Sequence, residues 1–275
     1  MNYTAYHFTV TPSDPGSEIL MAMISDMGFE SFDSHPDGFT AFIREEYEVQ
    51  VQLQDLHFDE FTYQVKKEKV EQRNWNEEWE KNFDPVRVDE LLLIRAPFHG
   101  FESKYRYEIV IMPKMSFGTG HHQTTQLMCK EMFDLEMKEK RVLDMGCGTG
   151  ILAILAEKLG AKEVLGVDID EWSVENSVEN VTMNRCTRVR ILKGDANLLE
   201  KESEFDIIIA NINKNILKSQ IPVYGQRMKS GGNLLLSGFF TTDVAELTKV
   251  AGKYGFVFQH SRHSGEWAMM RLHRS

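Results

Sequence analysis

The chain has 275 residues, of which 42% are hydrophobic and 27% are charged, and this composition excludes a disordered, collagen-like or disulfide-stapled protein. Lysine and arginine number 31 against 42 aspartates and glutamates, so the net charge of −11 argues against strong direct binding of nucleic acid through its phosphates. Three scattered cysteines, no signal-type N-terminus and no apolar run of spanning length favour a monomer in the cytoplasm, away from any membrane. The acidity either steers a basic macromolecular partner toward the protein or serves solubility alone.

The first 70 residues follow the order β-α-β-β-α-β. Pro36, Asp37 and Gly38 form the turn of a hairpin, and Gly28 ends the first helical pattern. This order is that of a small ferredoxin-like α+β domain over residues 1–70, which we expect to recognise the substrate. The predicted strands span residues 3–10, 29–33, 39–44 and 61–70, and the predicted helices span residues 13–27 and 45–56.

Residues 71–86 are predicted to form a helical linker. They are rich in charge, yet Trp75, Trp79 and Phe83 recur four residues apart, so one face of the helix is aromatic. Aromatic residues at helical spacing usually pack, and we therefore favour docking of this face on a neighbouring domain over an exposed binding epitope.

Residues 87–275 alternate between apolar strands and amphipathic helices. Such alternation predicts an α/β domain with a parallel, doubly wound sheet covered on both faces. The last two strands are joined by a short link, so they must form an antiparallel edge. The predicted strands are 141–145, 163–168, 188–193, 205–210, 232–237, 255–260 and 266–272, and the predicted helices are 122–136, 150–159, 171–184, 214–228 and 241–254.

The turn after the first of these strands carries glycines at 146, 148 and 150, which allow a ligand to approach the backbone at a helix N-terminus. Asp144 precedes them and would repel a pyrophosphate but attract a cation. S-adenosylmethionine, which carries a sulfonium, an ammonium and no phosphate, fits such a loop. Asp168 ends the next strand, where a carboxylate can bind both ribose hydroxyls. The alternatives, a turn cap for Asp144 and a surface acid for Asp168, are less favoured because both occur together at the right spacing.

Three further segments follow strand ends or precede the first helix. Asp195 is either a contact for the adenine amino group or a plain loop acid. Asn211 either orients an amine nucleophile as a catalytic residue that also borders the cofactor, or caps the next helix. Residues 115–125 are predicted to form a mobile flap over the ligand that closes against Phe117. The adjacent His121 and His122 point apart and no third ligand has suitable spacing, so we expect no metal site and at most a general-base role.

Together these motifs resemble the bacterial ribosomal protein L11 methyltransferases, which join a small N-terminal recognition domain through a helical linker to a class I methyltransferase domain. The similarity covers nearly the whole chain, with Asn74-Trp75 and Glu78-Trp79 resembling the family linker. His121, Gln123 and Asn213 depart from the threonine, proline and leucine that the family pattern suggests. The motifs are Ser-Phe-Gly-Thr-Gly-His-His-Gln-Thr-Thr from Ser116, Val-Leu-Asp-Met-Gly-Cys-Gly-Thr-Gly from Val142, Gly-Val-Asp-Ile-Asp from Gly166, Ala-Asn-Ile from Ala210, Leu-Ser-Gly-Phe from Leu236 and Gly-Glu-Trp-Ala from Gly265.

The resemblance implies methyl transfer from S-adenosylmethionine to lysine side chains and an N-terminal amine of ribosomal protein L11, free or on the ribosome. One alternative is a methyltransferase for another protein's lysine or glutamine, or for a nucleobase. Another is a ribosome-associated factor that binds the cofactor without transferring its methyl group. The expected cofactor-binding residues are Phe117, Thr119, Asp144, Gly146, Gly148, Gly150, Asp168, Asp195 and Asn211.

Overall fold

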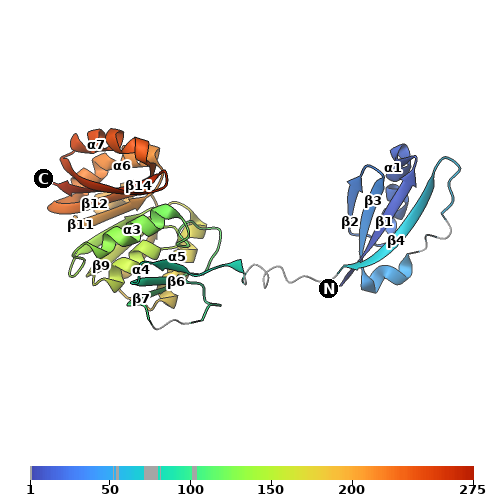
Figure 1. The fold of residues 1–275 in the computed structure, drawn as a ribbon, viewed down its shortest axis with the longest axis horizontal. Coiled ribbons are helices and arrows are strands. Elements are labelled where there is room, and N and C mark those ends of the chain that lie inside the picture. The colour runs from blue at the N-terminus through green and yellow to red at the C-terminus, as the bar shows by residue number, and fades with distance from the viewer. Residues whose placement is uncertain (1, 52, 54–55, 71–79, 81, 101–103) are drawn as a thin grey trace. The chain divides into compact units, whose positions relative to one another are not determined.

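The computed structural model describes residues 2–51, 53, 56–70, 80, 82–100 and 104–275 (Figure 1). The chain divides into two compact units, Met1–Asn82 and Phe83–Ser275, so the division falls inside the predicted linker. Most of that linker, including Trp75 and Trp79, lies outside the described residues. Among the described residues, no helix has the length and apolar character needed to cross a membrane.

The N-terminal unit is a four-stranded antiparallel sheet in the order β2-β3-β1-β4 with helix α1 packed on it. Alternate side chains of β1, among them Tyr6 and Phe8, enter a core with Leu20 and Ile24 of α1. This order confirms the ferredoxin-like fold. The elements are β1 Tyr3–Thr11, α1 Ser13–Ile24, η1 Ser25–Met27, β2 Ser31–His35, β3 Gly38–Arg44, η2 Glu45–Gln50 and β4 Thr62–Val70.

The prediction of a helix over 45–56 is wrong as an α-helix for Glu45–Gln50, which form the 3-10 helix η2, and residues 52, 54 and 55 lie outside the described residues. Hydrogen bonds to the sheet hold this segment: Glu48 accepts from the Thr4 hydroxyl at 3.0 Å and from the Tyr6 hydroxyl at 3.2 Å. Tertiary contacts of this kind override the helix propensity that the sequence pattern reports.

The C-terminal unit is built on a seven-stranded sheet in the order β10-β9-β8-β11-β12-β14-β13 (Figure 1). The first five strands in this order are parallel, and β14 runs antiparallel to both of its neighbours. The predicted doubly wound sheet with an antiparallel edge is thereby confirmed. The strands are β8 Arg141–Met145, β9 Glu163–Asp168, β10 Val189–Lys193, β11 Phe205–Asn211, β12 Met228–Phe240, β13 Phe256–Ser264 and β14 Trp267–Arg274.

Two hydrophobic cores lie on opposite faces of this sheet. Neighbouring residues of a strand point to opposite faces, so Val142 joins a core with α3 and α4 whereas Leu143 joins a core with α6 and α7. The result is a three-layer α/β unit. Its helices are α3 Gln123–Phe133, α4 Ile151–Lys158, α5 Glu171–Met183, α6 Lys214–Arg227 and α7 Val244–Gly252, with 3-10 helices η4 Ala196–Lys201 and η5 Thr241–Asp243.

A small three-stranded sheet, β5 Val86–Val88, β6 Leu92–Arg95 and β7 Tyr107–Val110, was not predicted from the sequence. Strands of three or four residues are too short for an alternation signal. Their apolar side chains, such as Ile94 and Ile109, pack into the same core as α3 and α4. Because β5 begins at Val86, the predicted linker ends too late. Phe83, from the predicted aromatic face, packs on His121 of the C-terminal unit at 4.7 Å between ring centroids.

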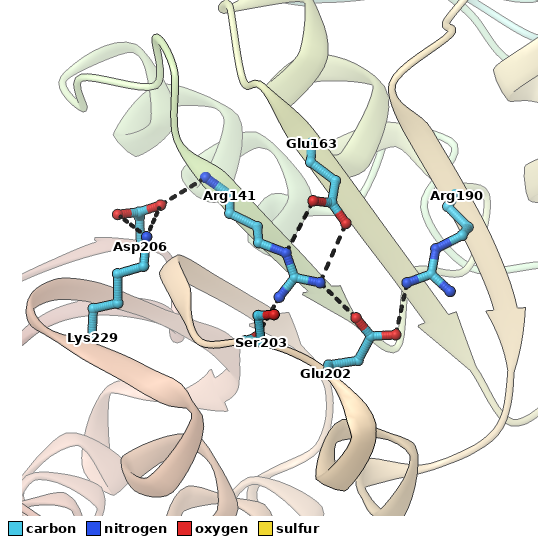
Figure 2. Close-up of polar contacts among 7 residues, drawn as sticks. All are labelled: Arg141, Glu163, Arg190, Glu202, Ser203, Asp206 and Lys229. Carbon is cyan, nitrogen blue, oxygen red and sulfur yellow. Dashed lines mark hydrogen bonds and ion pairs between the residues drawn. The ribbon is translucent and has the colours of Figure 1, made fainter.

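A network of charged side chains lies at the amino-terminal ends of the strands of the large sheet (Figure 2). Arg141, the first residue of β8, donates to Glu163 at 3.1 Å and to Glu202 at 2.5 Å, and its backbone N–H donates to Asp206 at 2.8 Å. Arg190 and Lys229 complete the network, which we call the amino-edge network. Burial raises the pKa of the Glu202 carboxyl, but the bonds from Arg190 and Arg141 outweigh this effect and hold that pKa below its ordinary value.

Candidate active site

The glycine loop after β8 adopts a backbone conformation that favours glycine. Gly146, Gly148 and Gly150 have φ values of 73°, 54° and 77°. A Cβ atom on Gly148 would lie 2.3 Å from the Phe117 carbonyl oxygen, and one on Gly146 would lie 2.2 Å from the Ile212 side chain. The loop therefore fits closely against the flap on one side and the end of β11 on the other.

Asp144 lies within this framework and is only 1% exposed. Its Oδ2 accepts from the backbone N–H of Ala153 at 3.0 Å, while its Oδ1 has no hydrogen-bond partner among the described residues. Burial raises the pKa of the Asp144 carboxyl to about 7, against the opposing bond from Ala153. The side chain thus anchors the first turn of α4 to the strand before it.

Asp168 links the glycine loop to the end of β9. Its Oδ2 accepts from the backbone N–H of Gly148 at 2.8 Å and its Oδ1 accepts from that of Asp170 at 3.0 Å. A carboxylate has about four lone-pair positions. Asp168 borders a cavity, so it can accept further hydrogen bonds there.

The flap is pinned to the glycine loop. The Phe117 carbonyl accepts from the Thr149 backbone N–H at 2.9 Å, and the Gly118 carbonyl accepts from the Thr149 hydroxyl at 2.6 Å. Met115, at the start of the flap, is 99% exposed. The flap therefore combines a fixed backbone with apolar side chains at the mouth of the site.

Both ring nitrogens of His121 and the Nδ1 of His122 make hydrogen bonds in the flap. His121 Nε2 donates to the Asp84 carbonyl at 2.9 Å, which leaves Nδ1 to accept from the Thr119 hydroxyl at 3.1 Å. His122 is the N-cap of α3, and its Nδ1 accepts from the backbone N–H of Thr124. This bond assigns the ring proton to Nε2 in the neutral form. These bonds support structural roles for both residues at the start of α3, and a general-base role stays a prediction.

The structure separates the two readings of Asn211. The N-cap of α6 is Asn213, whose side chain accepts from the Ile216 backbone N–H at 3.1 Å, so the cap alternative for Asn211 is wrong. Asn211 Nδ2 lies 3.5 Å from the Thr125 hydroxyl of α3. Its Oδ1 is buried and has no partner among the described residues. Asn211 thus presents an unused acceptor beside the cavity.

These features surround a cavity of about 610 Å³ beyond the carboxyl ends of β8, β9, β10 and β11. Thr119, Asp144 and Gly150 do not line it. Asp195 lines it and also caps η4 by accepting from the Asn197 backbone N–H at 2.9 Å. Among the described residues, no group of three or more metal-ligating side chains is placed to hold a metal ion. From the predicted set, the cavity is lined by Phe117, Gly146, Gly148, Asp168, Asp195 and Asn211.

Sequence reasoning missed part of the lining. His122, Gly238 and Trp267 border the cavity, although Gly238 and Trp267 had been given no role there and His122 at most that of a general base. The signal was present, because Gly238 and Trp267 belong to the motifs Leu-Ser-Gly-Phe and Gly-Glu-Trp-Ala that carry the family resemblance. Their place in one site depends on the pairing of β12 with β14, which the motifs alone do not state.

Comparison with known proteins identifies the family of this chain. Residues 32–275 match a family model described as ribosomal protein L11 methyltransferase (PrmA). The ribosomal protein L11 methyltransferase of Porphyromonas gingivalis is 41% identical over 99% of this chain and 98% of its own length. That of Bacteroides fragilis is 39% identical over 99% of both chains. A crystal structure of ribosomal protein L11 methylase from Lactobacillus delbrueckii subsp. bulgaricus superposes with a TM-score of 0.65 at 29% identity, over 70% of this chain and 99% of that one. The chain belongs to the ribosomal protein L11 methyltransferase family.

Proposed function

We propose that this protein transfers methyl groups from S-adenosylmethionine to amine nitrogens of ribosomal protein L11, on lysine side chains or the N-terminus. The observation that carries the proposal is that Asn211, whose buried Oδ1 has no partner among the described residues, lines the same cavity as Asp168. The names of the relatives support ribosomal protein L11 as the acceptor. Both relatives are named ribosomal protein L11 methyltransferase, and the similarity covers nearly their whole length.

The residues that line the cavity suit S-adenosylmethionine. Asp168 would hold the ribose hydroxyls and Asp195 the adenine end, while Gly146 and Gly148 let the ligand approach the backbone. Asp144 and Gly150 would act by shaping the loop. The volume of about 610 Å³ lies within the range of small-molecule sites. When bound, this cofactor supplies a methyl group that a positively charged sulfur has already activated.

The chain's own residues have to position a neutral amine and exclude water. A lysine has a reference pKa near 10.4, and desolvation lowers it by disfavouring the ammonium form. Asn211 Oδ1 would accept a hydrogen bond from the amine N–H and so aim the nitrogen lone pair. An amide suits this role because it adds no negative charge that would stabilise the unreactive ammonium.

We assign recognition of the protein substrate to residues 1–70, because every ligand-type motif follows residue 115. The net charge of −11 supports a basic substrate, whose encounter rate it would increase. A truncated chain that begins at Phe83 should bind S-adenosylmethionine but lose methylation of intact ribosomal protein L11. Full-rate methylation by this truncated chain would contradict the assignment.

The direct test incubates the purified protein with labelled S-adenosylmethionine and recombinant ribosomal protein L11, followed by mass spectrometry of the product. Label on lysine or the N-terminal amine supports the proposal, and absence of label from ribosomal protein L11 contradicts it. Calorimetry should show that Asp168→Ala weakens cofactor binding about tenfold or more, since charge-assisted hydrogen bonds are lost. Unchanged affinity would remove Asp168 from the site.

A further inference from the structure

Four aromatic rings follow one another at the mouth of the cavity, and we call them the aromatic row: Phe117, His122, Trp267 and Phe240. The ring centroids of Phe117 and His122 lie 5.2 Å apart. Those of His122 and Trp267 lie 4.8 Å apart, nearly perpendicular at 72°. Those of Trp267 and Phe240 lie 4.5 Å apart. The first three members line the cavity, so the row forms a continuous wall that leads into it.

The sheet itself builds one end of this row. Strand β12 is irregular between Ser237 and Phe239, and the shift brings Phe240 opposite Trp267 on β14. Gly238 lies within the irregularity with a φ of 90°, and a Cβ atom there would lie 2.3 Å from the Ile212 carbonyl oxygen. Any other residue at this position would push β12 away from the end of β11. The contact between Trp267 and Phe240 is therefore a product of this glycine bulge.

The other end of the row is fixed beside Asn211. His122 is the N-cap of α3, and its ring is held by its capping bond to Thr124. One residue further on, Thr125 contacts the Asn211 amide. A single helical turn thus positions both a ring of the row and the amide that we assign to the acceptor nitrogen.

The charges around the cavity divide it into two halves. Its acidic lining residues, Asp168, Asp170 and Asp195, lie at the end of β9 or after β9 or β10. The described lining residues from α3, α6, β12 and β14 are Thr124, Ile216, Gln220, Gly238 and Trp267, and none of them is charged. In this half a cation would meet uncharged side chains, among them the indole of Trp267, in place of a carboxylate.

Aromatic faces attract an alkylammonium group without fixing its proton as tightly as a carboxylate would. We propose that the aromatic row is the binding site for the aliphatic chain and ammonium group of the acceptor, and that it delivers the nitrogen to Asn211. This inference rests on the proposed function and extends it by naming the residues that select the acceptor. Trp267 is the central member, because it contacts both His122 and Phe240.

A binding experiment tests the row without methyl transfer. Choline, whose quaternary nitrogen cannot lose a proton, is titrated into the full-length protein and followed by nuclear magnetic resonance of the tryptophan indoles. Its neutral isostere, in which a tert-butyl group replaces the trimethylammonium group, measures the apolar contribution alone. Choline should bind at least about fivefold more tightly than the isostere. Equal binding of the two probes would overturn the proposal.

Variants locate the binding site. Trp267→Leu should weaken choline binding and raise the KM for ribosomal protein L11 by about tenfold, whereas Trp267→Phe should stay within about threefold of the wild type. Phe240→Leu, at a side chain 44% exposed and so tolerant of change, should have an intermediate effect. Trp172→Leu is the matched control, because Trp172 is 76% exposed and does not line the cavity.

The outcomes separate the two proposals. Absence of methyl transfer to ribosomal protein L11 by the wild type would contradict the proposed function. Normal transfer by the wild type, with choline affinity and KM unchanged in both Trp267→Leu and Phe240→Leu, would contradict the aromatic row alone. An equal loss in Trp172→Leu would also contradict it. Calorimetric binding of S-adenosylmethionine to each variant shows that the fold is retained.

Discussion

Polar groups differ in their hydrogen bonding between the two ends of the strands of the large sheet, which we call its amino-terminal and carboxyl-terminal edges. At the amino-terminal edge, Arg141 is bonded to Glu163 and Glu202 (Figure 2). At the carboxyl-terminal edge, Asn211 and Asp144 each keep a buried oxygen with no partner among the described residues. The same strands and hydrophobic cores run between the two edges, so the difference in hydrogen bonding comes from the residues at the strand ends. Satisfied polar groups stabilise the fold, whereas an unsatisfied buried acceptor costs stability. Of the two residues, Asn211 lines the cavity and can meet a ligand there.

The edges also differ in their expected response to pH. Burial raises the pKa of the Glu202 carboxyl, but Arg190 and Arg141 lower it further, so the net pKa lies below its ordinary value. The stability that the Glu202 carboxylate contributes is therefore lost as pH falls through that lowered pKa. The pKa of Asp144 is raised by burial to about 7, so its contribution is present at low pH and is lost as pH rises toward 7. Variants at each edge should therefore change different properties.

The largest expected effect is on catalysis, at the carboxyl-terminal edge. Asn211→Ala should lower kcat on the order of 10²–10³-fold with little change in cofactor affinity, since it removes an interaction that orients the acceptor in the transition state. Asn211→Asp keeps size and an acceptor oxygen but adds a charge that stabilises the ammonium form, so it should also be inactive. Steady-state kinetics, calorimetry and thermal melting check this. A stable, active aspartate variant would contradict the orienting role.

The next effect is on stability, at the amino-terminal edge. Arg141→Ala would leave Glu163 and Glu202 without their shared cation and should lower the free energy of unfolding by about 3 kcal/mol, or the Tm by roughly 6–12 °C. Arg141→Lys keeps the charge but loses the fork that bonds both carboxylates, so its loss should be smaller. Cofactor affinity at moderate temperature should match the wild type in both variants. A tenfold loss of that affinity would show that the edges are not independent.

A smaller effect should appear only as a function of pH. Asp144→Asn replaces the buried acid with a neutral amide and removes the cost of ionisation. Between pH 5 and pH 8 the wild type should lose roughly 2 kcal/mol relative to the variant, because its raised pKa is crossed in this range. Thermal melting of both proteins at the two pH values measures the difference. Parallel melting curves at both pH values would show that Asp144 is not the group that titrates.

The smallest effect concerns the start of α3. Gln123 is the first residue of this helix, where proline is well accepted, and the preceding His122 already has the extended conformation (φ −72°, ψ 138°) that a following proline requires. Gln123→Pro should raise the free energy of unfolding by about 0.4–1 kcal/mol, or the Tm by roughly 1–4 °C, with activity retained. A lower Tm would mean that the glutamine side chain or its N–H makes a contact that stabilises the helix start.

Much of the C-terminal unit could be predicted because its signals are local. Apolar runs indicated the long strands, and amphipathic spacing indicated the five long helices between them. The short strands β5, β6 and β7 carry too few residues for that signal. In the N-terminal unit, the 3-10 conformation of Glu45–Gln50 depends on hydrogen bonds to β1, which no local pattern reports.

The sequence alone determined the fold class, the glycine loop and the strand-end positions of Asp168 and Asn211, since these follow from periodicity and from the chemistry of single residues. Only the tertiary structure decided that Asn213, two residues after Asn211, is the helix cap. It likewise placed Asp144 behind the cavity wall and brought Phe240 opposite Trp267 through a bulge at Gly238. The physical reason is that side-chain direction and cross-strand register are set by packing between segments far apart in the chain.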